Sequence, residues 1–418
     1  MWFQMKVWLR NPANTLWLTP TFGALCGIII SVLAYMADFF WPMAKLPNVD
    51  ADLIGSLLSV ISSSMLAVST FSLSIIVSAY ASASNGVTPR ATQLVMGDDN
   101  SRVAVASFIS AFIFALIAQT TLGLEVVGNT GRFVLLVSTL LMLIYVVLTL
   151  IRWIGALSQL GRLGSTIAKI ETVAKDSMMH WRAHPCFGAK CMQQRWQGGQ
   201  ELFAKQSRYI THIDWQRMSQ WAQEHQAQIQ VYAIPGTLVG LHTALLCVKG
   251  LELTEEDQDI LHQCFVYNVT RDYEEDPRYG VIVLSEVALR ALSVGVNDPG
   301  TTILVLTHLL GVMVDARAPE ADETIEKTLY PNIEVNMFDE RELVSQPFAP
   351  IIAFAAEDVV VSLRLLKVLH QMHLNMPEAI LREEAKVQAQ NLLDRSQMKM
   401  AYHKDYEQIQ QTYAALFE

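Results

Sequence analysis

The chain has 418 residues, a formal net charge of −10 at pH 7, 52% hydrophobic residues and 17% charged residues. This length exceeds the roughly 100–200 residues of a single ordinary domain. The negative charge argues against a nucleic-acid partner, because binding a phosphate backbone needs a basic surface. Charged residues are sparse before residue 152 and frequent after it, so the chain divides into an apolar part and a polar part.

Four long apolar segments lie near the N-terminus, at about 15–36, 53–84, 103–124 and 133–151. A helix needs about 20 residues to cross a hydrocarbon core of ~30 Å, and each segment is long enough. The segments lack the alternation typical of barrel strands, which leaves helices as the predicted form. We therefore predict a membrane protein in contact with the lipid bilayer, with an α-helical four-span transmembrane domain in residues 1–152 followed by a soluble α+β domain.

The distribution of Lys and Arg predicts the orientation, because these residues concentrate in cytoplasmic loops. Basic residues occur in the N-terminal segment, in the 85–102 loop and after the fourth span, whereas the other two loops have only Lys45 and Arg132. The N-terminus and the C-terminal domain are therefore predicted to be cytoplasmic. No span has a charge near its middle, although proton-coupled pumps and many transporters have one there.

The second span is unusually long and rich in hydroxyl groups. Residues 53–84 would extend about 48 Å as a helix, which is longer than the hydrocarbon core, so the helix should tilt or project from it. Small and hydroxyl-bearing side chains recur every three or four residues on one face: Ser59, Ser63, Ala67, Thr70, Ser74, Ser78 and Ser82. One interpretation is close helix–helix packing. The other is a wetted permeation path with Leu66 or Phe71 as its constriction. Both are compatible in an oligomer.

The polar part is predicted to contain a helical connector at 153–200, a cytoplasmic α+β domain at 201–376 and a C-terminal helical tail at 377–418. The connector has apolar residues at helical spacing up to Trp181, which predicts an extension of the fourth span. Short β-prone runs occur at 208–213, 227–234 and 244–248. Helices are predicted at 215–226, 255–264, 281–292, 299–314, 350–373 and 377–418.

A dense polar motif lies between residues 270 and 302. It contains Arg271, Asp276, Glu286, Arg290, Asn297, Asp298 and Thr301. Glu286 and Arg290 are four apart and share a helix face. Asn297 and Asp298 are strong helix caps, so local capping is one explanation of the motif. The alternative is that the motif residues converge on a site for a small ligand or ion. A catalytic interpretation needs a nucleophile or acid–base pair in reach, which the sequence does not supply.

The cysteine pattern does not suggest a disulfide framework. Four of the five cysteines lie in the part predicted to be cytoplasmic: Cys186, Cys191, Cys247 and Cys264. His180 and His184 lie just before the first pair, which raises the question of a zinc site. Zinc clusters usually have a matching downstream pair, which is absent from this sequence, so a plain loop is predicted and no metal.

Several motifs resemble a known bacterial family of predicted membrane proteins that contains a domain of unknown function. They are Thr88-Pro89-Arg90, Arg271 with Glu275-Asp276-Pro277, Ala288-Leu289-Arg290-Ala291-Leu292-Ser293, Gly295, Asn297-Asp298-Pro299 and Thr301. The resemblance covers nearly the full length. The family usually has Ser, Gln and Pro where this chain has Thr88, Glu275 and Val294. Membership implies a bacterial inner-membrane location and four N-terminal helices, but no established activity.

These observations lead to one preferred function and one alternative. The preferred function is a homo-oligomeric ion channel or channel-like permeation protein, with the second span lining the path and the cytoplasmic domain regulating it. The alternative is a membrane-anchored sensor or scaffold without transport activity, with a small-molecule or ion site around Arg271, Arg290 and Asp298. No enzyme motif such as a P-loop or G-x-S-x-G is present, so no catalytic residue and no cofactor are predicted.

Overall fold

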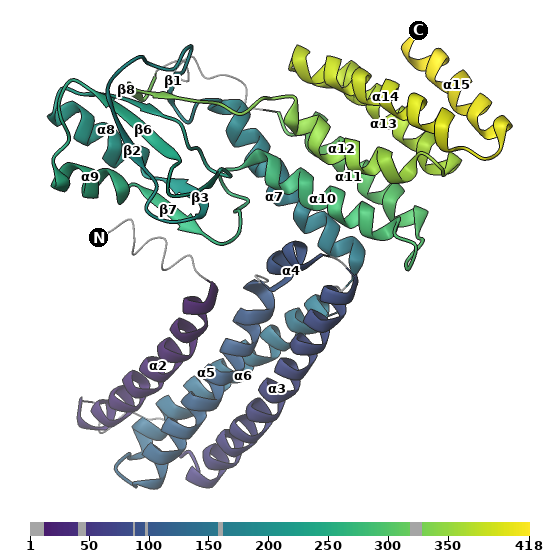
Figure 1. Cartoon of the computed structure of the whole chain (residues 1–418). Helices are drawn as coiled ribbons and strands as arrows, with labels where there is room; N and C mark the ends of the chain where they lie inside the picture. Colours follow the sequence, from purple (N-terminus) through teal and green to yellow (C-terminus); the bar gives the residue numbers. More distant parts are fainter. Residues whose placement is uncertain (1–11, 41–46, 87, 97–98, 158–161, 318–327) are drawn as a thin grey trace. The chain divides into compact units, whose positions relative to one another are not determined.

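The computed structural model describes the chain except for residues 1–11, 41–46, 87, 97–98, 158–161 and 318–327 (Figure 1). Lys45 and the N-terminal basic residues used for the orientation lie outside the described residues, and so does the side chain of Ser82. The described chain forms two compact units, Met1–Thr166 and Ile167–Glu418. We call them the membrane unit and the C-terminal unit and describe each by itself.

The membrane unit consists of helices. The long ones are α2 (Pro12–Phe40), α3 (Ala51–Gly86), α5 (Asp99–Gly123) and α6 (Asn129–Leu157), and a short helix, α4 (Pro89–Met96), follows α3. Four of them are long and apolar enough to cross a membrane, which confirms the predicted four spans. The α3 helix has 36 residues, or about 54 Å at the usual rise of 1.5 Å per residue.

Helix α5 forms the centre of the membrane unit. Half of its apolar window is buried inside the unit, compared with 17% for the corresponding windows of α2 and α6. It packs against α2, α3 and α6, and its side chains Phe108 and Phe114 are completely buried. The outer helices therefore keep large exposed faces, which are available to lipid or to another protein.

The C-terminal unit contains two small sheets. The larger has five strands in the order β1-β8-β4-β6-β2, and the smaller has three in the order β5-β3-β7. The bounds are β1 (Ala189–Cys191), β2 (Gln200–Phe203), β3 (Arg208–Ile213), β4 (Gln228–Val231), β5 (Leu238–Val239), β6 (Ala244–Lys249), β7 (Phe265–Asn268) and β8 (Tyr330–Val335). Helices α8 (Trp215–Glu224) and α9 (Glu255–His262) accompany them. The predicted strands at 208–213, 227–234 and 244–248 are confirmed as β3, β4 and β6.

Helices make up the rest of the C-terminal unit. They are α7 (Leu163–Ala183), α10 (Pro277–Ala291), α11 (Pro299–Asp315), α12 (Glu342–Ala355), α13 (Val359–Asn375), α14 (Ala379–Lys399) and α15 (His403–Phe417). In sequence order, α10 and α11 precede β8, and α12 to α15 follow it (Figure 1). The soluble part is therefore α+β, as predicted.

Two of the predicted helices are each divided into two shorter helices in the structure. The predicted helix at 350–373 is the end of α12 and most of α13, because Asp358 accepts hydrogen bonds from the backbone N–H groups of Val360 and Val361 and starts a new helix. The predicted tail helix at 377–418 is α14 and α15, with an interruption at residues 400–402. The connector begins its helix at Leu163, and the residues that would join it to α6 lie outside the described ones.

Candidate functional site

The predicted stripe on the second span lies on one exposed face of α3. Its members Ser59, Ser63, Ala67, Thr70, Phe71, Ser74 and Ser78 are all exposed. The Ser63 hydroxyl donates to the carbonyl oxygen of Ser59 at 2.8 Å, and that of Thr70 donates to the carbonyl of Leu66 at 2.6 Å. Each hydroxyl oxygen can still accept a hydrogen bond from water or a partner. We call this surface the α3 hydroxyl face.

A different set of α3 serines lies in the contacts between helices of the same chain. Ser62, Ser69 and Ser72 are at most 9% exposed and lie on the opposite side of α3, and α3 packs against α5. The Ser69 hydroxyl donates to the carbonyl oxygen of Met65 at 2.7 Å, which satisfies it inside the helix bundle. The small residues of the α3 hydroxyl face are therefore not needed for helix contacts within the chain.

The exposed faces of the neighbouring helices have a different composition. On α2 the large exposed side chains are Phe22, Leu25, Ile28, Ile29, Val32 and Leu33. On α6 they are Leu140, Leu141, Ile144, Val147, Leu148 and Ile151. Such apolar faces suit contact with lipid tails. Helix α3 also exposes apolar side chains, such as Val60, Leu66 and Val77. Its hydroxyl groups still make the α3 hydroxyl face the more polar of these surfaces, which favours a neighbour other than lipid.

A polar cavity of about 760 Å³ lies at the N-terminal end of the α3 hydroxyl face. It is lined by Ala51, Asp52, Gly55, Ser56, Ser59, Gln119, Leu122, Gly123, Glu125 and Arg132. The lining combines hydroxyl and amide groups with charges of both signs. The Nε of Arg132 is buried and has no hydrogen-bond acceptor among the described residues. The hydroxyl face thus begins in a cavity that water and ions can occupy.

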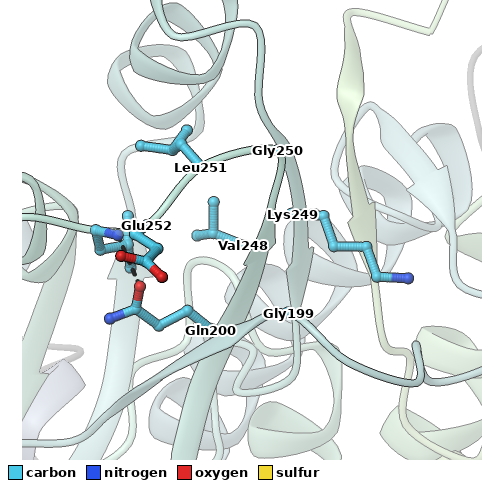
Figure 2. A pocket seen from close by; sticks show the side chains of 8 residues that line it. Gly199, Gln200, Val248, Lys249, Gly250, Leu251 and Glu252 are labelled. Carbon is cyan, nitrogen blue, oxygen red and sulfur yellow. Dashed lines mark hydrogen bonds between the residues drawn. The ribbon is translucent and has the colours of Figure 1, made fainter.

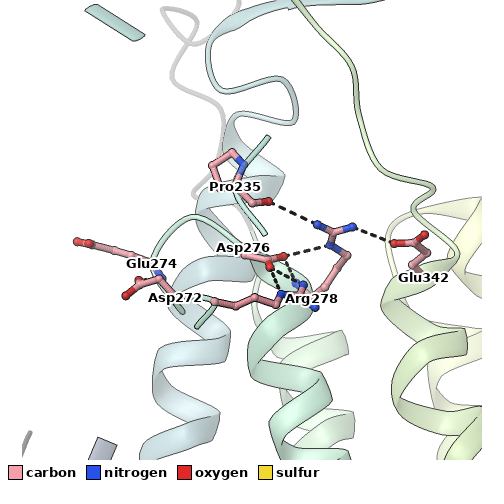
Figure 3. A network of polar contacts seen from close by, with 7 residues as sticks. Pro235, Asp272, Glu274, Asp276, Arg278 and Glu342 are labelled. Atoms are coloured by element: carbon pink, nitrogen blue, oxygen red, sulfur yellow. Dashed lines mark hydrogen bonds and ion pairs between the residues drawn. The ribbon is translucent and has the colours of Figure 1, made fainter. Parts of the chain in front are cut away.

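In the C-terminal unit, Asp276 connects the polar motif to the start of α10. Its carboxylate lies between two guanidinium groups (Figure 3). Arg271 donates from Nε to Oδ2 at 2.7 Å and also makes an ion pair through its terminal nitrogen. Arg278 donates from Nε to Oδ1 at 3.1 Å. Asp276 is 2% exposed, so both cations are needed to keep this buried charge. We call these contacts the Asp276 network.

The Asp276 network extends to two further elements. Arg278 pairs with Glu342 of α12 at 2.9 Å and donates to the carbonyl oxygen of Pro235 at 3.4 Å. The next residue, Gly236, has a φ of +86°, and a Cβ there would lie 2.0 Å from the Asp276 carboxylate. The Pro235-Gly236 turn therefore lies directly against the Asp276 carboxylate, and only glycine leaves room for it. Both carboxylate oxygens of Asp276 already accept hydrogen bonds from the two arginines, so neither is free to bind a ligand.

The other half of the predicted motif lies at the opposite end of α10. Asp298 caps α11 and accepts from the backbone N–H of Thr301 at 3.0 Å and from its hydroxyl at 2.6 Å. These bonds from Thr301 hold the pKa of Asp298 below its usual value. Helix α10 has 15 residues, or about 22 Å at the usual rise per residue. Asn297, Asp298 and Thr301 therefore do not meet Arg271 and Asp276 in one site.

The remaining predicted site residues are also dispersed. Glu286 and Arg290 lie within α10, half-buried and each with an interaction partner. Arg90 is exposed on α4 in the membrane unit. Capping and ion pairing thus account for the contacts described for the motif.

A group of acids surrounds His212 of β3. Its Nε2 lies 3.0 Å from Oε2 of Glu274, and ligand atoms of His212, Asp272 and Glu274 are within 4.8 Å of one another. That donor set is chemically suitable for a divalent transition metal. Burial raises the pKa of the neighbouring Glu275 to about 7. Although burial alone lowers the pKa of His212, the Glu274 hydrogen bond and nearby carboxylates raise it overall.

A second polar cavity, of about 590 Å³, lies beside strands β2 and β6 (Figure 2). Its polar groups are mostly occupied by the protein itself. Gln200 accepts the backbone N–H of Leu253 at 2.7 Å, and the amine of Lys249 lies over the Trp196 ring at 4.8 Å. Figure 2 shows the Lys249 side chain directed away from Glu252. Few polar groups of this cavity are therefore available to bind a ligand.

The structure of the Cys186–Cys191 pair differs from the prediction of a plain loop. The structure joins the two residues in a disulfide with a Cα–Cα distance of 5.4 Å, although the cysteine pattern did not suggest a disulfide framework. The turn at Phe187 and Gly188, both with positive φ, brings the chain back and so brings the two residues together. The rings of His180, on α7, and His184, just after its end, pack edge to face with centroids 5.7 Å apart.

Sequence reasoning missed the residues that reach the Asp276 network from elsewhere in the chain. Arg278 could have been found, because it follows the helix cap at Asp276 by two residues. Glu342 and the Pro235 carbonyl lie 64 and 43 positions from Arg278 in the sequence, and no local pattern marks them.

Comparison with known proteins gives one match. A family model described as "Predicted membrane protein (DUF2254)" matches residues 13–371. No curated protein and no solved structure matches the chain.

Proposed function

We propose that this chain, which belongs to the DUF2254 family of predicted membrane proteins, is an oligomeric, channel-like permeation protein for small ions. The observation that carries the proposal is the α3 hydroxyl face, which is exposed along most of a helix of 36 residues. Lipid tails offer hydroxyl groups no hydrogen bonds, whereas water in a path or a second copy of the helix does. In the proposed assembly, α3 from each copy lines the central path.

Two further features support this arrangement. The polar cavity at Ser56 and Ser59 provides a wet entrance at the N-terminal end of α3. Phe71 is 67% exposed and projects from the same helix, where it serves as a hydrophobic constriction in the proposed path. The apolar faces of α2 and α6 then face lipid.

The same proposal assigns an orientation. The basic residues of the 85–102 loop and of the chain after α6 support a position of these segments, together with the C-terminal unit, on the cytoplasmic side of a bacterial inner membrane. The cytoplasmic position allows the C-terminal unit to regulate permeation.

Flux through reconstituted protein tests the proposal. Liposomes that contain the full-length protein should release K⁺ or Cl⁻ faster than empty liposomes. Leucine at Ser63, Thr70 or Ser74 should lower the flux several-fold, because a branched apolar side chain removes the hydroxyl and narrows the path. Native mass spectrometry should show more than one copy per particle.

The matched control is Thr21→Leu, which makes the same change as Thr70→Leu at an exposed threonine on the apolar face of α2. This variant should conduct like the wild type. The proposal fails if no ion crosses faster than in empty liposomes, or if Thr21→Leu and Thr70→Leu have the same effect.

A further inference from the structure

A third cavity lies in the C-terminal unit, at the end of α7 and the start of α14. Its volume is about 510 Å³, within the range of roughly 300–1,000 Å³ typical of small-molecule sites. The lining residues are Trp181, Arg182, Pro185, Arg317, Glu340, Asn375, Pro377 and Glu378. They come from segments far apart in the sequence, so the cavity exists only in the folded unit.

One wall of this cavity is a buried, fully paired cation. Arg182 is 4% exposed and binds both carboxylate oxygens of Glu378, at 2.7 and 3.0 Å. The same guanidinium donates to the carbonyl oxygens of Ala316 at 2.6 Å and Met313 at 2.8 Å. This arrangement ties α7, the end of α11 and the start of α14 together. It leaves Arg182 and Glu378 with no net charge to offer a ligand.

Two other charged groups line the cavity, Arg317 and Glu340. Arg317 is exposed and Glu340 is half-buried, and their side chains make no hydrogen bond or ion pair within the part of the chain that the structure describes. Trp181 is 5% exposed and its indole nitrogen is buried, so this residue presents only part of its ring to the cavity. Burial raises the pKa of Glu340, and the neighbouring carboxylates Glu378 and Asp339 add to the effect. The carboxylate therefore lacks a cation.

These groups define the chemistry of a ligand. A carboxylate matches the Arg317 guanidinium, an ammonium group matches Glu340, and an apolar part matches the ring of Trp181 and the prolines Pro185 and Pro377. We propose that this cavity binds a small zwitterion with an apolar side chain, of which free α-amino acids are the simplest members. The proposal does not depend on permeation, because binding is measured without flux.

Calorimetric titration of the full-length protein in detergent tests the proposal. The probes are L-phenylalanine, L-leucine and L-methionine, with 3-phenylpropionate and phenethylamine as analogues that lack the ammonium and the carboxylate, respectively. At least one amino acid should bind one to one, and each analogue should bind at least tenfold more weakly than L-phenylalanine. Absence of binding at millimolar amino acid would overturn the proposal, as would equal binding of either analogue.

Variants locate the site. Arg317→Gln and Glu340→Gln should each weaken binding by roughly ten- to a hundredfold, since a hydrogen bond to a charged group usually contributes that much affinity. Arg341→Gln is the control, because Arg341 is exposed and pairs with Asp339, and its affinity should be unchanged. Binding that survives both Arg317→Gln and Glu340→Gln would place the ligand elsewhere.

Discussion

Glu275 has an environment very different from that of a free carboxylic acid in water. Burial raises its pKa to about 7, although it accepts a backbone hydrogen bond from Ile213 and lies near His212. The carboxylates of Asp272 and Glu274 add to the increase. Its Oε2 is buried without a partner among the described residues. A neutral carboxylic acid tolerates such a position better than a carboxylate does.

This environment predicts that the stability conferred by Glu275 falls as the pH rises. Between its unfolded value of 4.5 and its folded value of about 7, the folded protein binds a proton that the unfolded chain has lost. The free energy of unfolding should therefore decrease across this interval, by about 3 kcal/mol when complete. Glu275→Gln keeps the neutral shape, so it should match the wild type near the lower limit and be more stable above the upper limit. Denaturant titration of the detergent-solubilised protein across this range measures the difference.

His212 changes stability in the same direction, because its raised pKa also makes stability decrease as the pH rises through the folded value. A residual dependence should therefore remain in Glu275→Gln. Glu357→Gln is the control, since this carboxyl is 65% exposed, and its pH profile should follow the wild type. A Glu275→Gln profile parallel to that of the wild type would contradict the assignment of a buried, neutral carboxyl.

At the scale of elements, the close approach of α2 and α5 depends on a glycine. A Cβ at Gly23 would lie 2.4 Å from Cβ of Ser110 and 2.8 Å from its Cα. At Gly27, one turn later, it would lie 3.2 Å from Ile117. The two helices pack backbone to side chain, as small residues allow in membranes.

Gly23→Ala should accordingly push α2 away from α5 and lower stability by about 1–3 kcal/mol, the usual cost of overpacking. The change is seen as a lower melting temperature of the detergent-solubilised protein. Gly155→Ala in α6 is a matched control, because a Cβ there meets no atom within 4 Å. A melting temperature for Gly23→Ala equal to that of the wild type would show that α2 and α5 are not held this closely.

Individual elements could be predicted from the sequence where their ends carry local signals. Asp298 caps α11 before Pro299, as the residue types indicated, and the predicted helix at 255–264 begins at a capping box of Thr254 and Asp257. The break between α12 and α13 was missed because apolar residues continue at helical spacing from Ile351 to Leu369. Both helices bury their apolar faces, so the periodicity does not reveal the interruption.

The candidate site was less predictable than the elements. Arg271 and Asp276 were identified as part of a polar motif, but their distance from Asn297 and Asp298 follows from the length of α10. Glu342 and Gly236 join the Asp276 network only after distant segments have packed. Long-range contacts of this kind leave no periodic signal in one sequence.

At the scale of the whole molecule, the proposed orientation can be tested with the Cys186–Cys191 pair. Their Cα atoms are 5.4 Å apart, a distance at which two cysteines can form a disulfide. In the proposed orientation both residues lie in the cytoplasm, where the glutathione and thioredoxin systems keep thiols reduced. On the opposite side of the membrane the same pair would be oxidised.

We therefore expect both cysteines to be thiols in intact cells and to form the disulfide only after oxidation. A membrane-permeant alkylating reagent applied before lysis, followed by mass spectrometry, should find both residues alkylated. Oxidation before alkylation should protect both in the wild type but leave Cys186 reactive in Cys191→Ser. A disulfide found in cells alkylated before lysis would reverse the proposed orientation, and a fluorescent protein fused to the C-terminus provides an independent measurement. The α3 hydroxyl face and its polar cavity keep their geometry in either orientation. This outcome would therefore change the side of the membrane on which the cavity lies, but not the proposed path.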